Sequence, residues 1–414
     1  MDFLGALWTA CVERVGSIVA TIIVSVLSVL LWAGLKWLWR AFERFRYFIR
    51  SRRRALDAVG RVPTSGGLCE GRGVWLTRPV ELPEDYARRV RASKVLAVAN
   101  LKGGVGKTTL AANIGAYLAK ERHLRVLLID LDFQGSLSSM AFPQEDWVPL
   151  EGQNSLATQL ISNDIRPQQL PLIARRVSLG TDANASLGQL AVITSFYDLA
   201  QAENRLMVEW LLNCQPSWSR GFVGRLLDIF GFKRFKLKDV RYVLAQILQT
   251  DVVEKAFDLI ILDCPPRLTT AGIQAFCASS HLLIPTIFDR TSAEAVISFH
   301  QQIETLKQEG ICRELKYLGV VGTKWSGNQI IPPMWRDQTR QDLEGTELSV
   351  LSDDMFFRHA TAIVNHADEG IAYLAVPEVR ANADVRQAMG RLATHVAQRM
   401  GIPDRGQPTL MAAE

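Results

Sequence analysis

The chain of 414 residues is long enough for one large α/β domain with additional segments. Its formal net charge of +5 is uneven, because residues 36–61 alone carry nine basic and two acidic side chains, a local charge of +7. This distribution excludes a uniformly basic nucleic-acid-binding protein. The six cysteines show no CxxC pair or other metal-ligand spacing, so we expect reduced and mostly buried thiols.

An apolar segment near the N-terminus is the first predicted element. Residues 15–35 contain no charged side chain, and 21 residues of helix span the roughly 30 Å hydrocarbon core of a bilayer. Tryptophans lie at both ends of the segment, as in an aromatic belt: Trp8, Trp32, Trp37 and Trp39. We therefore expect a transmembrane helix over residues 15–39, preceded by an extracytoplasmic end of residues 1–14. A buried core helix is the alternative.

The basic residues follow the apolar segment, and only Arg14 precedes it. The positive-inside rule then predicts a single-pass protein of the inner (cytoplasmic) membrane, with the N-terminus outside and the rest in the cytoplasm. Residues 40–54 form a basic juxtamembrane segment in which aromatic side chains are interleaved. We expect basic residues 36–54 to contact anionic lipid, each contributing about 1 kcal/mol near the surface. A nucleic-acid patch is the alternative.

Residues 55–93 are rich in glycine and proline and are predicted to form a linker, with one short strand over residues 74–77.

A glycine-rich stretch follows an apolar run and precedes a helical pattern. It reads Lys102-Gly103-Gly104-Val105-Gly106-Lys107-Thr108-Thr109. Strand, glycine-rich turn and helix are the context that a phosphate-binding loop needs, because backbone N–H groups and the helix N-terminus then face the phosphates. Lys107 would reach the β- and γ-phosphates, and the Thr108 hydroxyl would ligate Mg²⁺. The stretch predicts a nucleotide site.

Two later apolar runs end in acidic residues. Residues 125–129 precede Asp130 and Asp132, and residues 259–262 precede Asp263. In a parallel sheet these carboxylates lie at the carboxyl edge, beside the phosphate loop. Asp263 can then hold a Mg²⁺-bound water. For Asp130 and Asp132, capping of the next helix is the alternative.

Several ordered motifs over about residues 93–400 resemble the ParA/MinD family of deviant Walker A P-loop ATPases. They are Lys102 at the start of the loop, the Asp-x-Asp motif followed by Gln134-Gly135, and Asp263-Cys264-Pro265-Pro266. The resemblance implies a doubly wound, mainly parallel α/β sheet that binds ATP and Mg²⁺. It also implies a homodimer that forms on ATP binding, in which Lys102 contacts the nucleotide held by the partner subunit.

The resemblance also implies roles for individual residues. Asp130 would help Thr108 and Asp263 to organise Mg²⁺, and Asp132 would position or activate the attacking water. Catalysis would then rest on Lys102, Lys107 and Asp132. Thr323 and Lys324 fall where the family begins adenine recognition, often with Asn.

We expect the ATPase domain to cover residues 94–402, with a helical insertion at about 200–250 and a flexible tail at 403–414. Within the insertion, residues 218–241 interleave basic and aromatic side chains. This segment could contact membrane, nucleic acid or protein, and a helix with a solvated basic face is an equal alternative.

Together these features predict a membrane-anchored ATPase switch, slow and stimulated by a partner, that controls an unidentified membrane or envelope client. A tethered ParA-like DNA partition or regulatory ATPase is the alternative, so nucleic acid is a partner that is not favoured. A bacterial tyrosine kinase fits less well, because the chain has one apolar span and no tyrosine after Tyr373. A scaffold that binds nucleotide without turnover is a further alternative.

Overall fold

The computed structural model describes residues 8, 24–43, 45–46, 75–76, 86–92, 94–143, 147–150, 152–179, 188–213, 239–325, 333–358, 369–377 and 383–403. The chain divides into two compact units, Met1–Gly60 and Arg61–Glu414. Parts of the predicted extracytoplasmic end, juxtamembrane segment and linker, most of the segment 218–241, and the tail after Pro403 lie outside the described residues.

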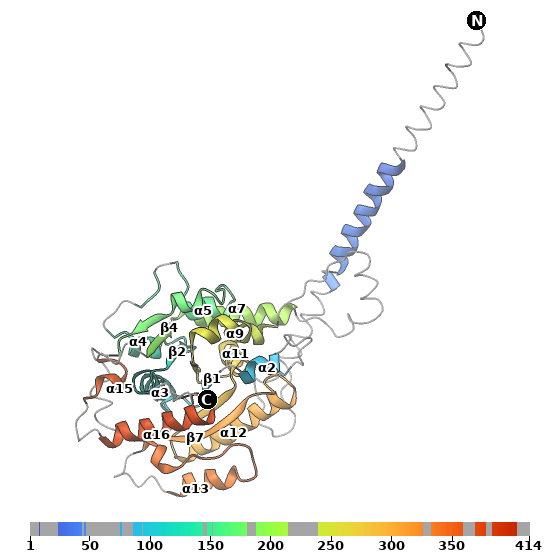
Figure 1. The fold of residues 1–414 in the computed structure, drawn as a ribbon. Helices are drawn as coiled ribbons and strands as arrows, with labels where there is room; N and C mark the ends of the chain where they lie inside the picture. Colours follow the sequence, from blue (N-terminus) through green and yellow to red (C-terminus); the bar gives the residue numbers. More distant parts are fainter. Residues whose placement is uncertain are drawn as a thin grey trace, which may run out of the picture. The chain divides into compact units, whose positions relative to one another are not determined.

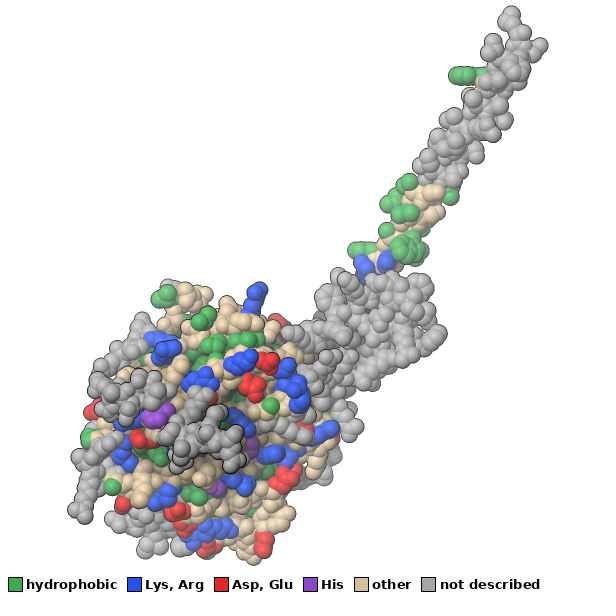
Figure 2. Space-filling view, in the orientation of Figure 1, with side chains coloured by type: hydrophobic (Ala, Val, Ile, Leu, Met, Phe, Trp, Pro, Cys, Tyr) green, Lys and Arg blue, Asp and Glu red, His purple; other side chains and the backbone are tan. Residues whose placement is uncertain are grey.

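The first unit contains one helix, Val24–Glu43, among its described residues. It is 20 residues long and contains an 18-residue window with a mean hydropathy of 1.2, which is enough by length and composition to cross a membrane. Hydrophobic side chains cover its surface and basic ones gather near its C-terminal end, as Figure 2 shows. It is a candidate anchor, and residues 15–23 of the predicted span lie outside the described part of the chain.

The second unit is built on an eight-stranded sheet in the order β3-β4-β2-β5-β1-β6-β7-β8 (Figure 1). All neighbouring strands are parallel except β3 and β4. Because β1 is central and the chain moves outward on both sides, the predicted doubly wound, mainly parallel sheet is confirmed. The strands are β1 (Val95–Val98), β2 (Arg125–Asp130), β3 (Arg175–Val177), β4 (Gln189–Ile193), β5 (Leu259–Asp263), β6 (His281–Thr286), β7 (Lys316–Trp325) and β8 (Phe357–Arg358).

Helices cover both faces of this sheet (Figure 1). The helices described in this unit are α2 (Tyr86–Ala92), α3 (Lys107–Glu121), α4 (Ser136–Ala141), α5 (Leu156–Ile161), α6 (Leu170–Ile173), α7 (Asp198–Asn213), α9 (Val243–Leu248), α10 (Asp251–Ala256), α11 (Thr270–Ala278), α12 (Arg290–Gln308), α13 (Pro333–Asp342), α15 (Ala372–Ala375) and α16 (Ala383–Arg399), with 3₁₀ turns η3 (Val240–Tyr242) and η4 (Asp353–Met355).

Two hydrophobic cores lie on opposite faces of the sheet. In β1, Val95 and Ala97 belong to the core that includes α5, α7, α9, α11 and α12. Leu96 and Val98 belong to the core that includes α3, α4 and α16. Because successive side chains of a strand point to opposite faces, a strand buried on both faces must be apolar throughout. This explains the uninterrupted apolar runs that precede the predicted motifs.

Part of the predicted linker packs on the second unit. Trp75 and Leu76 form a turn, so the strand expected over residues 74–77 is not seen in this pair. Trp75, Tyr86 and Val90 are buried in the core that contains α7 and α11. The segment between the candidate anchor and β1 is therefore attached to the domain at Trp75 and along α2.

Candidate nucleotide-binding site

The glycine-rich loop joins β1 to the N-terminus of α3, as predicted. Gly104 and Gly106 have φ angles of 73° and 80°, in the left-handed region that glycine adopts without a Cβ clash. Asn100, which sequence reasoning missed, fixes the start of the loop. Its side-chain amide donates to the Pro285 carbonyl at 2.8 Å, and its side-chain oxygen accepts from the Lys102 amide at 3.0 Å. The loop is thereby attached to β6.

Lys107 lies at the first position of α3 and is 7% exposed. Its ammonium group donates to the Lys102 carbonyl at 3.0 Å, so the side chain reaches back across the loop. Burial lowers the pKa of Lys107, and the negative charges of Asp263 and Asp132 oppose that shift. A phosphate bound in the loop would meet this ammonium and the amides at the start of α3.

Asp130 and Asp263 are side by side at the carboxyl edge of the sheet, because they are register partners on the parallel strands β2 and β5. Both are fully buried. Asp130 accepts from the Ser138 amide at 2.9 Å, the Ser138 hydroxyl at 2.7 Å and the Asp132 amide at 3.2 Å. Burial raises the pKa of Asp130 to about 6, although these hydrogen bonds favour its charged form. Asp130 therefore orders the loop that carries Asp132.

The two carboxylate oxygens of Asp263 accept no hydrogen bond of good geometry from a described residue, although the Thr108 hydroxyl lies close enough to favour the charged form. Burial and the neighbouring charge of Asp130 raise its pKa well above the usual range, while the Thr108 hydroxyl and Lys107 act in the opposite direction. A buried carboxylate without a partner is costly unless a cation neutralises it. A hydrated divalent cation such as Mg²⁺, which prefers oxygen ligands, therefore fits this position.

Asp132 lies on the loop after β2 and is partly exposed. Its carboxylate accepts from the Gln134 amide at 3.1 Å, and its carbonyl accepts from the Gly135 amide at 3.0 Å. Gly135 has a φ of 65° and precedes α4. The turn holds Asp132 at the same edge of the sheet as Asp130 and Asp263, so the structure brings together the three predicted carboxylates.

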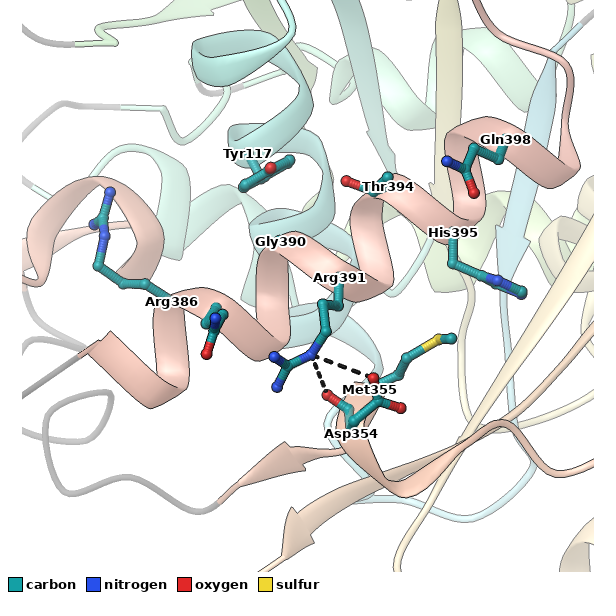
Figure 3. Close-up of a pocket in the computed structure, with 10 residues that line it drawn as sticks. Tyr117, Asp354, Met355, Arg386, Gly390, Arg391, Thr394, His395 and Gln398 are labelled. Carbon is teal, nitrogen blue, oxygen red and sulfur yellow. Dashed lines mark hydrogen bonds and ion pairs between the residues drawn. The ribbon is translucent and has the colours of Figure 1, made fainter.

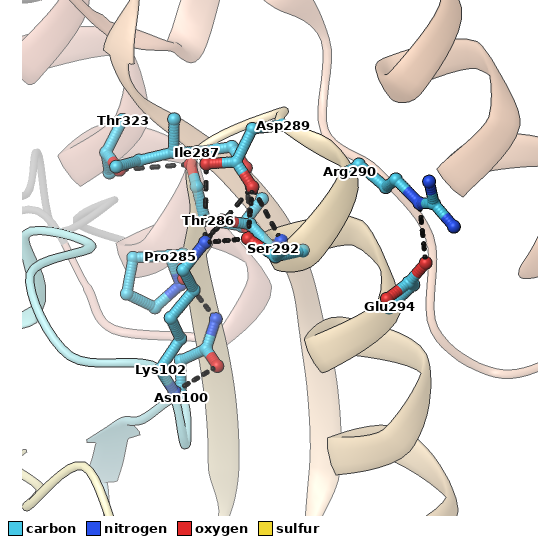
Figure 4. Close-up of polar contacts among 11 residues, drawn as sticks. Asn100, Lys102, Pro285, Thr286, Ile287, Asp289, Arg290, Ser292, Glu294 and Thr323 are labelled. Carbon is cyan, nitrogen blue, oxygen red and sulfur yellow. Dashed lines mark hydrogen bonds and ion pairs between the residues drawn. The ribbon is translucent and has the colours of Figure 1, made fainter.

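Lys102 points away from the phosphate loop toward the N-terminus of α12 (Figure 4). Its ammonium group lies 3.0 Å from Asp289 Oδ1, 2.6 Å from the Thr291 hydroxyl and 2.6 Å from the Ser292 hydroxyl. Asp289 also accepts from the Ser292 amide at 2.7 Å and so caps α12. The sequence analysis did not identify Asp289 as the partner of Lys102.

Thr323 is buried beneath the phosphate loop. Its hydroxyl lies 2.7 Å from the Val105 carbonyl and 3.0 Å from the Thr286 carbonyl, and its single proton serves one of them at a time. The side chain therefore supports the loop from β7. The side chain of Lys324 lies outside the described residues.

A separate pocket of about 560 Å³ lies between α3, α16 and η4 (Figure 3). Tyr117, which lines it, is ten residues after Lys107 on α3, or about 15 Å along the helix. Two of its basic side chains are already engaged: Arg386 donates to the Tyr373 carbonyl at 2.9 Å, and Arg391 donates to the Asp354 carbonyl at 2.9 Å. This pocket is distinct from the phosphate loop.

Comparison with known proteins places this geometry in a family. The model described as "CobQ/CobB/MinD/ParA nucleotide binding domain" matches residues 96–351, more than half of the chain.

Individual relatives agree with that match. The chain is 28% identical over 262 residues to the chromosome partitioning protein ParA of Myxococcus xanthus, covering 63% of this chain and 71% of that protein. It is 24% identical over 245 residues to the chromosome-partitioning ATPase Soj of Thermus thermophilus, covering 59% of this chain and 75% of that protein. The solved structure of a Cyanothece McdA variant in complex with ATP shares the fold, with a TM-score of 0.53 and 19% identity over 76% of this chain and 99% of that chain. The chain belongs to the CobQ/CobB/MinD/ParA nucleotide-binding family.

Proposed function

We propose that this protein is a membrane-anchored ATPase switch, in which ATP joins two protomers and hydrolysis separates them. The observation that carries the proposal is Asp263, a buried carboxylate without a described partner, next to Asp130 and within the electrostatic influence of Lys107. This arrangement is suited to a nucleotide phosphate accompanied by a divalent cation.

Each residue then has a defined task. The amides of the glycine-rich loop and the ammonium of Lys107 bind the phosphates and stabilise the charge that develops during phosphoryl transfer. Thr108 and Asp263 would hold Mg²⁺, which supplies neutralisation of phosphate charge. Asp130 keeps the loop after β2 in place through Ser138, and Asp132 orients the attacking water.

Dimer formation requires Lys102 to change partners. In the single protomer its ammonium is held by Asp289, Thr291 and Ser292. The Lys102 and Asp289 side chains are 29% and 46% exposed, so the pair can open without unpacking the core. We propose that Lys102 leaves Asp289 to contact the nucleotide bound by the partner subunit.

The proposed anchor is the helix Val24–Glu43, most of whose side chains are apolar and exposed. With the basic residues that follow, it would hold the protein in the inner membrane with the ATPase unit in the cytoplasm. A permanently inserted protein would regulate a fixed membrane or envelope system, so we propose a membrane or envelope protein as its client.

DNA partition is the second candidate, because the relatives include proteins described as chromosome partitioning. The basic segment 218–241 was the sequence feature in its favour. Of its basic residues, Arg241 is described, and it is buried and paired with Asp239. Arg241 is therefore unavailable to a nucleic acid.

The test is phosphate release by the full-length protein in detergent, together with a pull-down of bound partners. Asp132→Ala should abolish release while it traps the ATP-bound dimer, whereas Lys107→Ala should prevent both. An envelope protein enriched only with the trapped form would support the anchored switch. Enrichment of DNA that is lost when Lys233, Arg234 and Lys236 are replaced by alanine would favour partition. Phosphate release that is at background in the wild type and unchanged by Asp132→Ala would indicate a nucleotide-binding scaffold.

A further inference from the structure

We infer that Trp75 is a positioning residue for the ATPase reaction, because it connects the predicted linker, residues 55–93, with the loop between β5 and α11. The inference rests on the proposed ATPase function. Trp75 is 2% exposed although its neighbours in sequence belong to a glycine- and proline-rich region. Burial of so large a side chain indicates a specific attachment to the domain.

The first contact is with the loop that joins β5 to α11. The indole N–H of Trp75 donates to the Leu268 carbonyl at 3.3 Å. Leu268 lies five residues after Asp263 and two residues before α11 begins at Thr270. A hydrogen bond from a rigid indole to this carbonyl restricts the path of the chain that leaves Asp263.

A cage of side chains holds the indole in place. Its ring stacks on Trp210 of α7, with ring centroids 5.5 Å apart and an interplanar angle of 10°. The guanidinium of Arg241 donates to the Trp75 carbonyl at 2.8 Å and lies 5.0 Å from the Trp210 ring. Arg241 is 1% exposed and forms an ion pair with Asp239, so its charge is compensated inside the domain.

The same helix holds the other end of the loop. Glu203 lies seven residues before Trp210 on α7, so both side chains are on one face of the helix. The Glu203 carboxylate accepts from the Ala271 amide at 2.9 Å. The main-chain carbonyl of Glu203 accepts from the Thr270 hydroxyl, also at 2.9 Å. The loop is therefore held at Leu268 through Trp75 and at the start of α11 through Glu203.

The held loop also reaches the Asp-x-Asp motif. Arg267, the residue before Leu268, places its guanidinium 5.8 Å from the ring of Phe133, which follows Asp132. A shift of the Leu268 carbonyl would therefore change the positions of Asp263, at the end of β5, and of Phe133, the neighbour of Asp132. Trp75 can in this way influence the chemical step while contacting neither nucleotide nor cation.

Two further contacts attach α2, the last part of the predicted linker, to the rest of the domain. The Tyr86 hydroxyl of α2 donates to the Cys277 carbonyl of α11, and Arg89 donates to the Gln249 carbonyl at 2.8 Å. With α2 attached independently, removal of the Trp75 N–H should perturb the loop without releasing the segment.

The test compares Trp75→Phe with Trp210→Phe in the full-length protein reconstituted in phospholipid vesicles. Trp75→Phe keeps an aromatic ring for the stack but removes the N–H, whereas Trp210 donates no described hydrogen bond to the loop. We expect Trp75→Phe to lower kcat for phosphate release about threefold to tenfold, as for loss of one hydrogen bond, with the ATP Kd unchanged. Trp210→Phe should leave kcat near the wild-type value, and Trp75→His, which retains a ring N–H, should recover part of the loss.

Equal kcat values for Trp75→Phe and the wild type would overturn the inference. So would equal losses in Trp75→Phe and Trp210→Phe that follow their melting temperatures, because this would show a purely structural role. A wild-type protein that binds ATP without releasing phosphate would instead contradict the proposed function, which is a different result.

Discussion

The ammonium of Lys102 lies 3.0 Å from Oδ1 of Asp289, a residue 187 positions later in the chain (Figure 4). Burial alone would raise the pKa of Asp289, but hydrogen bonds from the Ser292 amide, Lys102, Thr291 and the Ser292 hydroxyl outweigh it and hold the pKa at about 2. Asp289 is therefore charged at neutral pH. The positive charge of Lys102, which the proposed dimer needs, is therefore compensated by Asp289 of the same protomer.

Substitution Asp289→Asn should favour the ATP-bound dimer. Asn caps helices as well as Asp does, so α12 is retained, while the charge that holds Lys102 is removed. Because an exposed ion pair contributes about 0–1 kcal/mol and dimer formation opens one pair in each protomer, the dimer dissociation constant should fall by up to about thirtyfold. Sedimentation with ATP in an Asp132→Ala background measures this constant. Glu294→Gln, which removes the exposed pair with Arg290 on the same helix, is the matched control and should have no effect. A weaker Asp289→Asn dimer would contradict the proposed exchange.

Substitution Asp263→Asn should separate protein stability from nucleotide binding. The variant removes a buried carboxylate without a described partner, so the melting temperature without nucleotide should stay the same or rise. The stabilisation by Mg²⁺ and ATP, about 2.7 kcal/mol at a hundredfold excess over Kd, should be lost. Thermal scans with Mg²⁺ or with EDTA measure both effects. An unchanged Mg²⁺-dependent shift would exclude Asp263 from the cation site.

Substitution Gly135→Ala should destabilise the Asp132 turn. A Cβ there would lie 2.8 Å from the Trp147 ring and 2.9 Å from the Ser195 carbonyl, and φ is 65°. We expect a loss of about 1–3 kcal/mol in the free energy of unfolding, together with slower phosphate release. Gly345→Ala is the control, since its φ is 80° but no atom lies within 4 Å of the added Cβ. Equal losses in a urea titration would show that backbone strain alone is responsible.

Stability should fall as the pH decreases from about 6.5 to 4, partly because of His281. Burial, followed by the charges of Lys316, Lys94 and Arg399, lowers the pKa of His281 to about 4. Below the unfolded-state pKa near 6.5 the unfolded chain binds a proton that the folded chain does not, so acid favours unfolding. In His281→Gln, the urea concentration at the unfolding midpoint should fall less between pH 6.5 and pH 4 than it does in the wild type, when each is normalised to its value at pH 7.5. Some slope should remain, since the pKa values of His300 and His395 are also lowered by burial. An unchanged slope would contradict this assignment.

The candidate anchor should fail when charge is placed near the centre of the membrane span predicted over residues 15–39. Two substitutions, Leu27→Arg and Leu30→Arg, each add about 3 kcal/mol to the cost of insertion. We expect the variant in the soluble fraction, whereas the wild type should resist extraction with alkaline carbonate. Leu38→Arg is the control, because a long basic side chain near the end of a span reaches the interface. Release of the wild type by carbonate would contradict the anchor.

The sequence predicted the sheet and the edge at which Asp130 and Asp263 meet, because buried parallel strands require apolar runs and end at one edge. It did not predict the partner of Lys102, since no local pattern pairs residues so distant in the chain. Trp75 was assigned to a linker because its neighbours are turn-forming residues, whereas its stacking on Trp210 depends on tertiary packing. The predicted role of Thr323 in adenine recognition stays a prediction, and the structure adds that its hydroxyl lies next to the Val105 carbonyl of the phosphate loop.

The residues that hold Trp75 flank, in the sequence, the basic and aromatic residues 214–238, which lie outside the described part of the chain. Trp210 lies at the last turn of α7 before that stretch, and Asp239 and Arg241 follow it directly. Trp210 stacks on Trp75, and Arg241 holds its carbonyl. The described residues on either side of the stretch therefore hold Trp75, which donates to the Leu268 carbonyl. A molecule that binds residues 214–238 would act on these residues, so partner binding and the proposed membrane attachment would both influence the position of the Leu268 loop.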